Sequence, residues 1–233
     1  MIKPRNKLLS GISDADLATL EPSLEHCLLE KGQVLDGANE PIEFVYFPES
    51  GIASIIALDE HERRIEVGPF GREGMSGTPV VLEAKTCPLE TSVQAPGVAY
   101  RISADVLRDR MRASPSLHRQ LLRYAQAFHV QTSQTLLVNS YANVEQRLAR
   151  WLLMAHDRID GDDLPLTHEF IAVMLGVRRA GVTEATHMLE ERRFIKATRG
   201  LIVVQNREGL VALAGQSYGS SEAEYVRLMD ERP

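Results

Sequence analysis

The segment from residue 166 to residue 206 constrains the fold of this chain most strongly. Thr167 stands where a residue before a helix would accept a backbone N–H bond, and apolar residues follow at helical spacing. Gly176 ends this pattern, because glycine readily adopts a positive φ after a helix. A second helix is expected to begin near Arg178. Its apolar face would be formed by Val182, Ala185, Met188 and Leu189.

Two β-rich runs follow these helices. Phe194-Ile195 and residues 201–204 flank a turn at Arg199-Gly200, which predicts a β-hairpin. Two short helices and a hairpin in this order indicate a winged helix-turn-helix, whose second helix enters the major groove of DNA. The same spacing also fits an ordinary pair of helices and a hairpin with solvated charges.

The distribution of charge favours the DNA-binding interpretation. Between residues 176 and 207 the chain has seven Lys or Arg and three Glu, a net charge of +4. The whole chain carries −6, so the remainder carries −10. A local positive patch on an acidic protein is typical of a surface that contacts phosphate.

The rest of the sequence is ordinary for a globular protein. Its 233 residues suffice for one large domain or two modest ones, and no apolar run approaches the roughly 18 residues that span a membrane. The first residues lack the pattern of a signal peptide. Cys27 and Cys87 are isolated, which fits a reducing compartment better than a disulfide framework. We therefore expect a cytoplasmic protein without a membrane segment.

The region from about residue 25 to 105 predicts β-structure. Short β-prone runs alternate with turn residues at intervals of about 8–12 residues, which favours a barrel or sandwich over a parallel sheet. The runs lie at residues 26–29, 33–35, 43–47, 52–58, 64–67, 90–94 and 98–102.

A long helix is expected after Ser114-Pro115. Its residues recur at alternate steps of four and three over about three heptads, which favours pairing with a second copy of the chain. The alternative is a helix packed on the core of its own domain. Gln131 and Thr135 interrupt the stripe and could face a ligand or fix the register. The residues expected at the dimer interface are Leu117, Leu121, Tyr124, Phe128 and Val138.

A β-rich lobe, a long helix and a C-terminal winged helix-turn-helix, in that order, resemble the Crp/Fnr family of bacterial transcription regulators. The resemblance covers nearly the whole chain and is most specific in residues 143–149, 166–190 and 202–204. It implies an α+β fold with an N-terminal antiparallel β-roll of the double-stranded β-helix or jelly-roll type. The expected domains are a β-roll sensor at 1–113, a dimerisation helix at 114–141, and a DNA-binding domain with a C-terminal tail at 142–233.

The resemblance also implies roles for residues of the two short helices. In the family, the residue matching Arg179 reads a base, and those matching Arg178 and His168 contact the DNA backbone. An arginine fork suits this role because it pairs with O6 and N7 of guanine. Ala180 and Glu184 depart from the best-studied members, so we expect a different operator. The candidate DNA-binding residues are Thr167, His168, Arg178, Arg179, Thr183, Glu184, His187 and Arg199.

The sensor lobe departs further from the family. Its cyclic-nucleotide sensors hold ribose with a Glu after a glycine loop, and Glu73 in residues 70–77 matches that position. Leu89 and Glu90 stand where an Arg-Ser pair would hold the phosphate, and a carboxylate there would repel it. We therefore expect no cyclic-nucleotide binding, with a cyclic-nucleotide-responsive regulator as the alternative. The candidate effector-pocket residues are Arg72, Glu73, Glu90, Gln131 and Thr135.

A metal-dependent enzyme of the cupin type is the alternative from another functional class. Such enzymes need a histidine and carboxylate triad, but the β-rich segment has only His26 and His61. We therefore expect no catalytic residue, metal or cofactor. The expected partners are double-stranded DNA with a pseudo-palindromic operator, a second copy of the chain, RNA polymerase and an unknown small-molecule effector.

Overall fold

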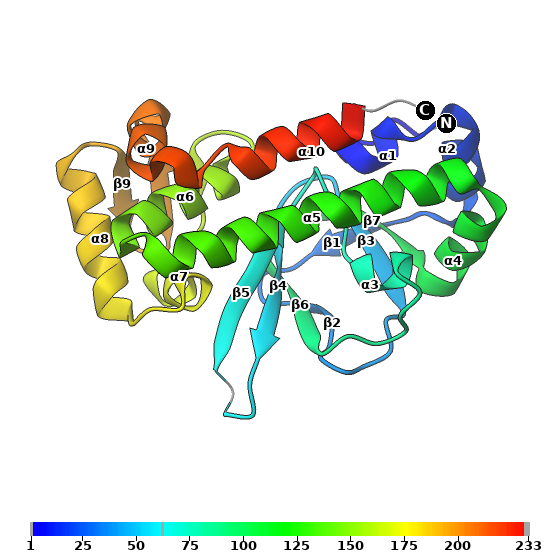
Figure 1. Ribbon diagram of the computed structural model, residues 1–233, viewed down its shortest axis with the longest axis horizontal. Helices are drawn as coiled ribbons and strands as arrows, with labels where there is room; N and C mark the ends of the chain where they lie inside the picture. Colours follow the sequence, from blue (N-terminus) through cyan, green and yellow to red (C-terminus); the bar gives the residue numbers. More distant parts are fainter. Residues whose placement is uncertain (1, 62, 231–233) are drawn as a thin grey trace.

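The computed structural model describes residues 2–61 and 63–230. Figure 1 shows a long helix, α5 (Pro115–Tyr141), that runs the length of the molecule. A β-rich lobe lies along one part of α5, and a mostly helical lobe surrounds its C-terminal end. We call these the β-roll and the C-terminal lobe. The predicted α+β fold class is confirmed.

The β-roll consists of two antiparallel sheets, as the strand spacing predicted. Their orders are β1-β7-β3 and β2-β6-β4-β5. The observed strands match the predicted runs closely because apolar alternation and turn residues mark both ends of most strands. The strands are β1 (Glu25–Leu29), β2 (Val34–Asp36), β3 (Phe44–Pro48), β4 (Ile52–Leu58), β5 (Arg64–Phe70), β6 (Leu89–Ala95) and β7 (Gly97–Ser103).

Short helices close the ends of the β-roll. Ser13 accepts a bond from the backbone N–H of Asp16 and so caps the second helix. Asn6 is fully buried and donates to the carbonyls of Pro48 and Gly74, which fixes the entry segment to the roll. The helices are α1 (Lys7–Gly11), α2 (Asp14–Leu20), η1 (Glu21–Ser23), α3 (Thr78–Val81) and α4 (Ala104–Ala113).

The interior of the β-roll is apolar. One group of buried side chains centres on Val93 and Ala99, and another on Ile55 and Phe70. Leu89 packs against the second group. These apolar side chains fill much of the space between the two sheets and solvate charge poorly, while the buried Asp36 carboxyl group is hydrogen-bonded to Thr91.

The predicted dimer face of α5 is wrong. Leu117, Leu121 and Tyr124 are at most 3% exposed and belong to the core that α5 shares with the β-roll. Phe128 packs against the same core, and Val138 is 2% exposed. A heptad stripe marks a buried helix face without specifying what buries it. The alternative, in which the helix packs on its own domain, is correct for these five residues.

The opposite face of α5 is exposed and lacks charge. Leu136 and Leu137 are 74% and 54% exposed, and Leu122 is 40% exposed. From Tyr124 to Tyr141 the sequence contains no Lys, Arg, Asp or Glu, and His129 is the only titratable side chain apart from the two tyrosines at its ends. Exposed leucines on a long helix without flanking charges are typical of an interaction surface.

The C-terminal lobe begins with a capping box. The side chain of Asn143 accepts from the backbone of Gln146, and the side chain of Gln146 accepts from the backbone of Asn143. Its three short strands form a sheet in the order β8-β10-β9. The elements are α6 (Val144–His156), β8 (Asp163–Leu164), α7 (His168–Leu175), α8 (Arg179–Glu191), β9 (Ile195–Thr198), β10 (Leu201–Val204) and α9 (Arg207–Ala214).

The last segment folds back onto α5, where a C-terminal tail was expected. After η2 (Gly215–Ser217), the helix α10 (Ser220–Asp230) lies along α5 (Figure 1). Tyr225 and Met229 pack against the core of the β-roll, and the Tyr225 hydroxyl donates to the Glu73 carbonyl at 2.7 Å. Helix α10 therefore links the two lobes.

Among the described residues, no helix combines the length and hydrophobicity that a membrane crossing requires.

Candidate DNA-binding surface and lobe junction

The turn between α7 and α8 has the geometry that the sequence predicted. Thr167 caps α7 by accepting from the backbone of Phe170, and Gly176 ends it with a φ of 60°. Val182, Ala185 and Leu189 of α8 are buried as expected. Met188, expected on the same apolar face, is 37% exposed.

The solvent-facing side of α8 carries polar residues that can contact DNA. Arg178, Arg179 and Glu184 are exposed, with the two arginines at the start of the helix. Thr183 is half-buried, and its hydroxyl donates to the Arg179 carbonyl at 3.1 Å. The same hydroxyl lies 3.2 Å from His168 Nδ1, so α7 and α8 are joined across this face.

A groove runs between α7, α8 and the β9–β10 hairpin, which forms the wing. Six of the eight candidate DNA-binding residues line it. Arg178 and Glu184 do not line it. The six are Thr167, His168, Arg179, Thr183, His187 and Arg199.

Glu190 also lines this groove, and sequence reasoning missed it. Its carboxylate accepts from the backbone of Ala197 at 2.9 Å, so it fixes the wing to α8. Its position on α8 next to the hairpin gave no separate signal, because an exposed glutamate near a helix end is common.

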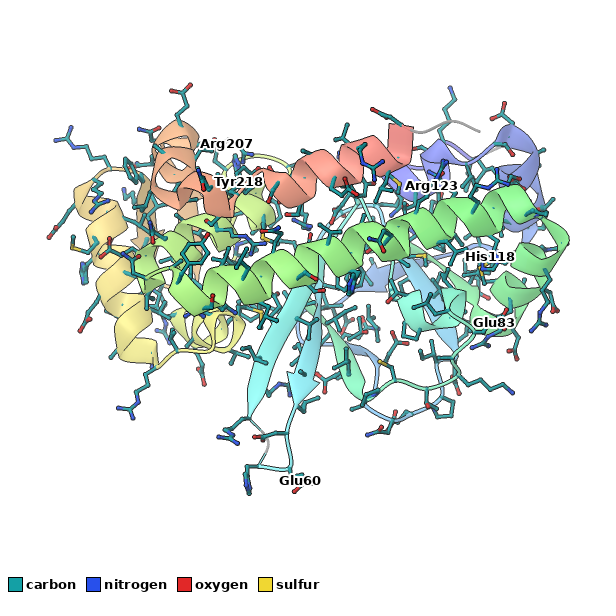
Figure 2. The ribbon with its side chains drawn as sticks, in the orientation of Figure 1. Glu60, Glu83, His118, Arg123, Arg207 and Tyr218 are labelled. Atoms are coloured by element: carbon teal, nitrogen blue, oxygen red, sulfur yellow. The ribbon has the colours of Figure 1, made fainter. Side chains whose placement is uncertain are left out.

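The β4–β5 hairpin of the β-roll approaches the start of α8. Arg178 and Arg179 line a hollow together with Asp59, Arg63 and Ile65. Figure 2 shows Glu60 at the tip of this hairpin, which projects away from α5. The charged tip and the arginines of α8 therefore lie on the same side of the molecule.

The residues predicted to hold an effector contact other parts of the chain instead. Arg72 points to the loop after α6, with its guanidinium 2.5 Å from the Asp160 carboxylate. Glu90 pairs with Arg64 on the outside of the roll. Both residues were expected inside an effector pocket. Leu89 is partly buried and packs against the core of the roll, so its neighbour Glu90 lies on the opposite face of β6.

Glu73 pairs with a buried arginine of the C-terminal lobe. Its carboxylate lies 2.7 Å from Arg158 Nε, and the Arg158 side chain is 6% exposed. Arg158 also donates to the Met154 carbonyl at 2.6 Å and to Gln131 Oε1 at 2.9 Å. Gln131 in turn donates to the Pro69 carbonyl at 2.9 Å. The chain itself therefore supplies partners to Glu73 and Gln131.

Arg150 of α6 contacts Thr135, the last of the five predicted effector residues. Arg150 donates to the Thr135 hydroxyl at 3.2 Å and to the Ser217 carbonyl at 2.7 Å. Burial lowers the pKa of Arg150, and the negative charges of Glu222 and Glu66 act against that shift. All five predicted effector residues thus have intramolecular partners.

The residues that join the two lobes form the lobe junction. Ile52, Ile56 and Ala95 of the β-roll pack into the same core as α6, α7 and α8. Arg207 and Tyr218, labelled in Figure 2, both bind the Asp157 carboxylate, at 2.6 and 2.7 Å, at the base of α10. Sequence reasoning missed this junction, because its contacts join residues far apart in the chain.

The comparisons with known proteins agree with this geometry. Residues 146–213 match the family model described as the Crp-like helix-turn-helix domain. This part of the C-terminal lobe is therefore similar to a Crp-like helix-turn-helix domain. A search of curated proteins finds no match.

Solved structures share the whole fold. FixK2 from Bradyrhizobium japonicum is 18% identical, with a TM-score of 0.69 over 82% of this chain and 98% of that chain. TTHB099 from Thermus thermophilus, a transcriptional regulator of the CRP family, is 17% identical, with a TM-score of 0.68 over 83% and 99%. A crp/fnr-family regulator from Eubacterium rectale is 17% identical, with a TM-score of 0.70 over 90% and 98%.

The predicted resemblance to Crp/Fnr regulators is therefore confirmed for the fold and for the DNA-binding domain. The match to the Crp-like domain ends at residue 213, so α10 lies outside it. Among residues 2–61 and 63–230, no group of three or more His, Cys, Asp or Glu side chains could hold a metal ion.

Glu73→Gln tests the buried ion pair of the lobe junction. Removing one partner leaves the Arg158 charge buried without compensation, so the free energy of unfolding should fall by about 3–5 kcal/mol. Urea unfolding followed by circular dichroism measures the change. The control, Glu90→Gln, breaks a more exposed pair and should cost less than about 1 kcal/mol. Equal losses in the two variants would contradict the assignment of Arg158 and Glu73 as the main ionic link.

Proposed function

We propose that this protein is a homodimeric, sequence-specific DNA-binding transcription regulator whose β-roll does not bind a cyclic nucleotide. The observation that carries the proposal is the exposed Arg179 at the start of α8, in one groove with His168 and Arg199. A helix entering the major groove presents its first residues to base edges, so Arg179 is placed to read a base.

The surroundings of Arg179 suit a DNA backbone. Arg178 precedes the first turn of α8, where free backbone N–H groups and the helix dipole also attract phosphate. Arg199 lies in the turn of the wing before Gly200, whose φ of 78° makes the turn tight. Contacts on both sides of α8 would fix its depth and angle in the groove, while the base contact would supply specificity.

Arg179→Ala should lower affinity for the specific operator about 5- to 150-fold, because a bidentate base contact contributes about 1–3 kcal/mol. The loss should appear only with operators that keep the base pair read by Arg179. Random DNA should bind almost as tightly as it binds the wild type. Electrophoretic mobility shifts on selected genomic fragments at fixed salt measure both affinities. Arg192→Ala serves as the control, because Arg192 lies 3.6 Å from Glu145, away from the groove. An equal loss on specific and random DNA would contradict base reading by Arg179.

Dimerisation is proposed through the exposed face of α5. Leu122 and Leu136 are two heptads apart with His129 between them, and with Leu137 they are exposed on the side opposite the β-roll core. Two copies paired along this face would present two α8 helices to one side of DNA. Half-sites would then lie about 34 Å apart, one helical turn of the duplex.

Leu136→Glu tests this face. A carboxylate in the centre of an apolar helix pair would be desolvated, so the dimer should dissociate and operator affinity should fall at least tenfold. Sedimentation equilibrium at micromolar concentration measures the mass. Leu28→Glu is the matched control, because Leu28 is 68% exposed on β1. A Leu136→Glu protein that remains dimeric would exclude this face.

Three features argue against a cyclic nucleotide in the β-roll. Leu89 fills the position of the expected phosphate ligand with an apolar side chain, and Glu90 next to it is paired with Arg64. Glu73, the match to the ribose ligand, is neutralised by Arg158. A bound phosphate would have to displace hydrocarbon without gaining a cationic donor there.

The remaining expectations form part of the proposal. We propose a sensor at 1–113, a dimerisation helix at 114–141 and a DNA-binding domain at 142–233, with α10 returning to α5. We assign the protein no catalytic activity and place it in the cytoplasm, where bacterial DNA lies. Contact with RNA polymerase and control by an unknown small molecule stay predictions.

A further inference from the structure

A buried carboxylate and the single tryptophan of the chain meet at the lobe junction. Glu66 lies on β5, opposite Ile56 of β4, on the face of the β-roll that packs against α6. Its Oε2 accepts from Trp151 Nε1 of α6 at 2.6 Å, and its Oε1 accepts from the Ser54 hydroxyl at 2.5 Å. Glu66 is 5% exposed and Trp151 is 3% exposed. The contact therefore exists only while the two lobes are docked.

No direct ion pair compensates the charge of Glu66 among the described residues. The positive charges of Arg150 on α6 and of Arg158, just after α6, act on it at longer range. Arg158 is bound to Glu73, and Arg150 is bound to Ser217 and Thr135. The neighbour from β4 is the neutral Ser54.

Burial dominates the ionisation of this carboxyl group. It raises the pKa of Glu66 from 4.5 to about 7, although Ser54, Trp151 and the two arginines favour the ionised form. In an open state the side chain would regain water and its ordinary pKa. The docked state therefore binds the proton more tightly, and docking weakens as pH rises from about 4.5 to 7, with little change above that range.

We propose that Glu66 and Trp151 form a proton-controlled latch between the β-roll and the DNA-binding domain. The latch is closed when Glu66 is protonated and loosens when Glu66 ionises, because the docked state must then bury a carboxylate that lacks a direct cation. Since α8 belongs to the same compact domain as Trp151, ionisation frees the DNA-reading helix to move relative to the β-roll. The latch is independent of the proposed DNA-binding function.

Trp151 reports on the latch directly, because the chain contains no other tryptophan. Its fluorescence in the full-length protein should titrate between about pH 5.5 and 8.5 with a midpoint near 7. In Glu66→Gln the amide oxygen still accepts from the indole but cannot ionise, so the emission should stay at its low-pH value throughout. Hydrogen exchange of the backbone of α6 should be about tenfold faster at pH 8 than at pH 6, after correction for intrinsic exchange, in the wild type only.

Two further variants keep the test decisive if Glu66→Gln fails to fold. Ser54→Ala removes one donor to the ionised form, so the midpoint should move to higher pH. Asp36→Asn controls for another buried carboxyl group, whose pKa burial raises to about 6, and should leave the titration unchanged. A wild type without a titration, a titration that persists in Glu66→Gln or vanishes in Asp36→Asn, or an unmoved midpoint in Ser54→Ala would each overturn the proposal.

Discussion

The buried guanidinium of Arg158 is the interaction on which the arrangement of this protein depends. It comes from the turn after α6 in the C-terminal lobe and binds Glu73 in the β-roll and Gln131 on α5. A buried charge of this kind costs several kcal/mol of desolvation unless its donors are satisfied. The terminal nitrogens of Arg158 donate to Met154 and Gln131, and Glu73 balances its charge, so separating the lobes would leave that charge unpaired.

The contacts of Arg158 also occupy polar groups of the β-roll and of α5. Glu73, Gln131 and Thr135 line the region where the fold would place an effector, and each is bound by the chain itself. Helix α10 adds Tyr225 against the Glu73 loop. A cavity of about 330 Å³ remains between α5, α10 and this loop, lined partly by the aromatic rings of Tyr124 and Phe128. These contacts join the β-roll to the C-terminal lobe through residues of the chain itself.

Local signals predicted most of the fold. The strand runs, the caps at Ser13, Asn143 and Thr167, and the turn at Gly176 depend on neighbouring residues, so the sequence reveals them. Long-range contacts could not be predicted in this way. The α5 stripe was assigned to a partner because a heptad pattern is the same for an internal core and for a dimer. Arg158 and Glu66 read as ordinary charged residues until the fold placed them at the lobe junction.

The most direct test of this account is operator affinity measured with and without cyclic nucleotide. The dissociation constant of the wild-type dimer for its operator should stay within about twofold when cyclic AMP or cyclic GMP is added to about 1 mM, since the roll offers no phosphate ligand. Calorimetry on the free protein should detect no saturable binding of either nucleotide. A tenfold gain in operator affinity, together with saturable nucleotide binding, would contradict the account. It would show that the nucleotide displaces Arg158 from Glu73.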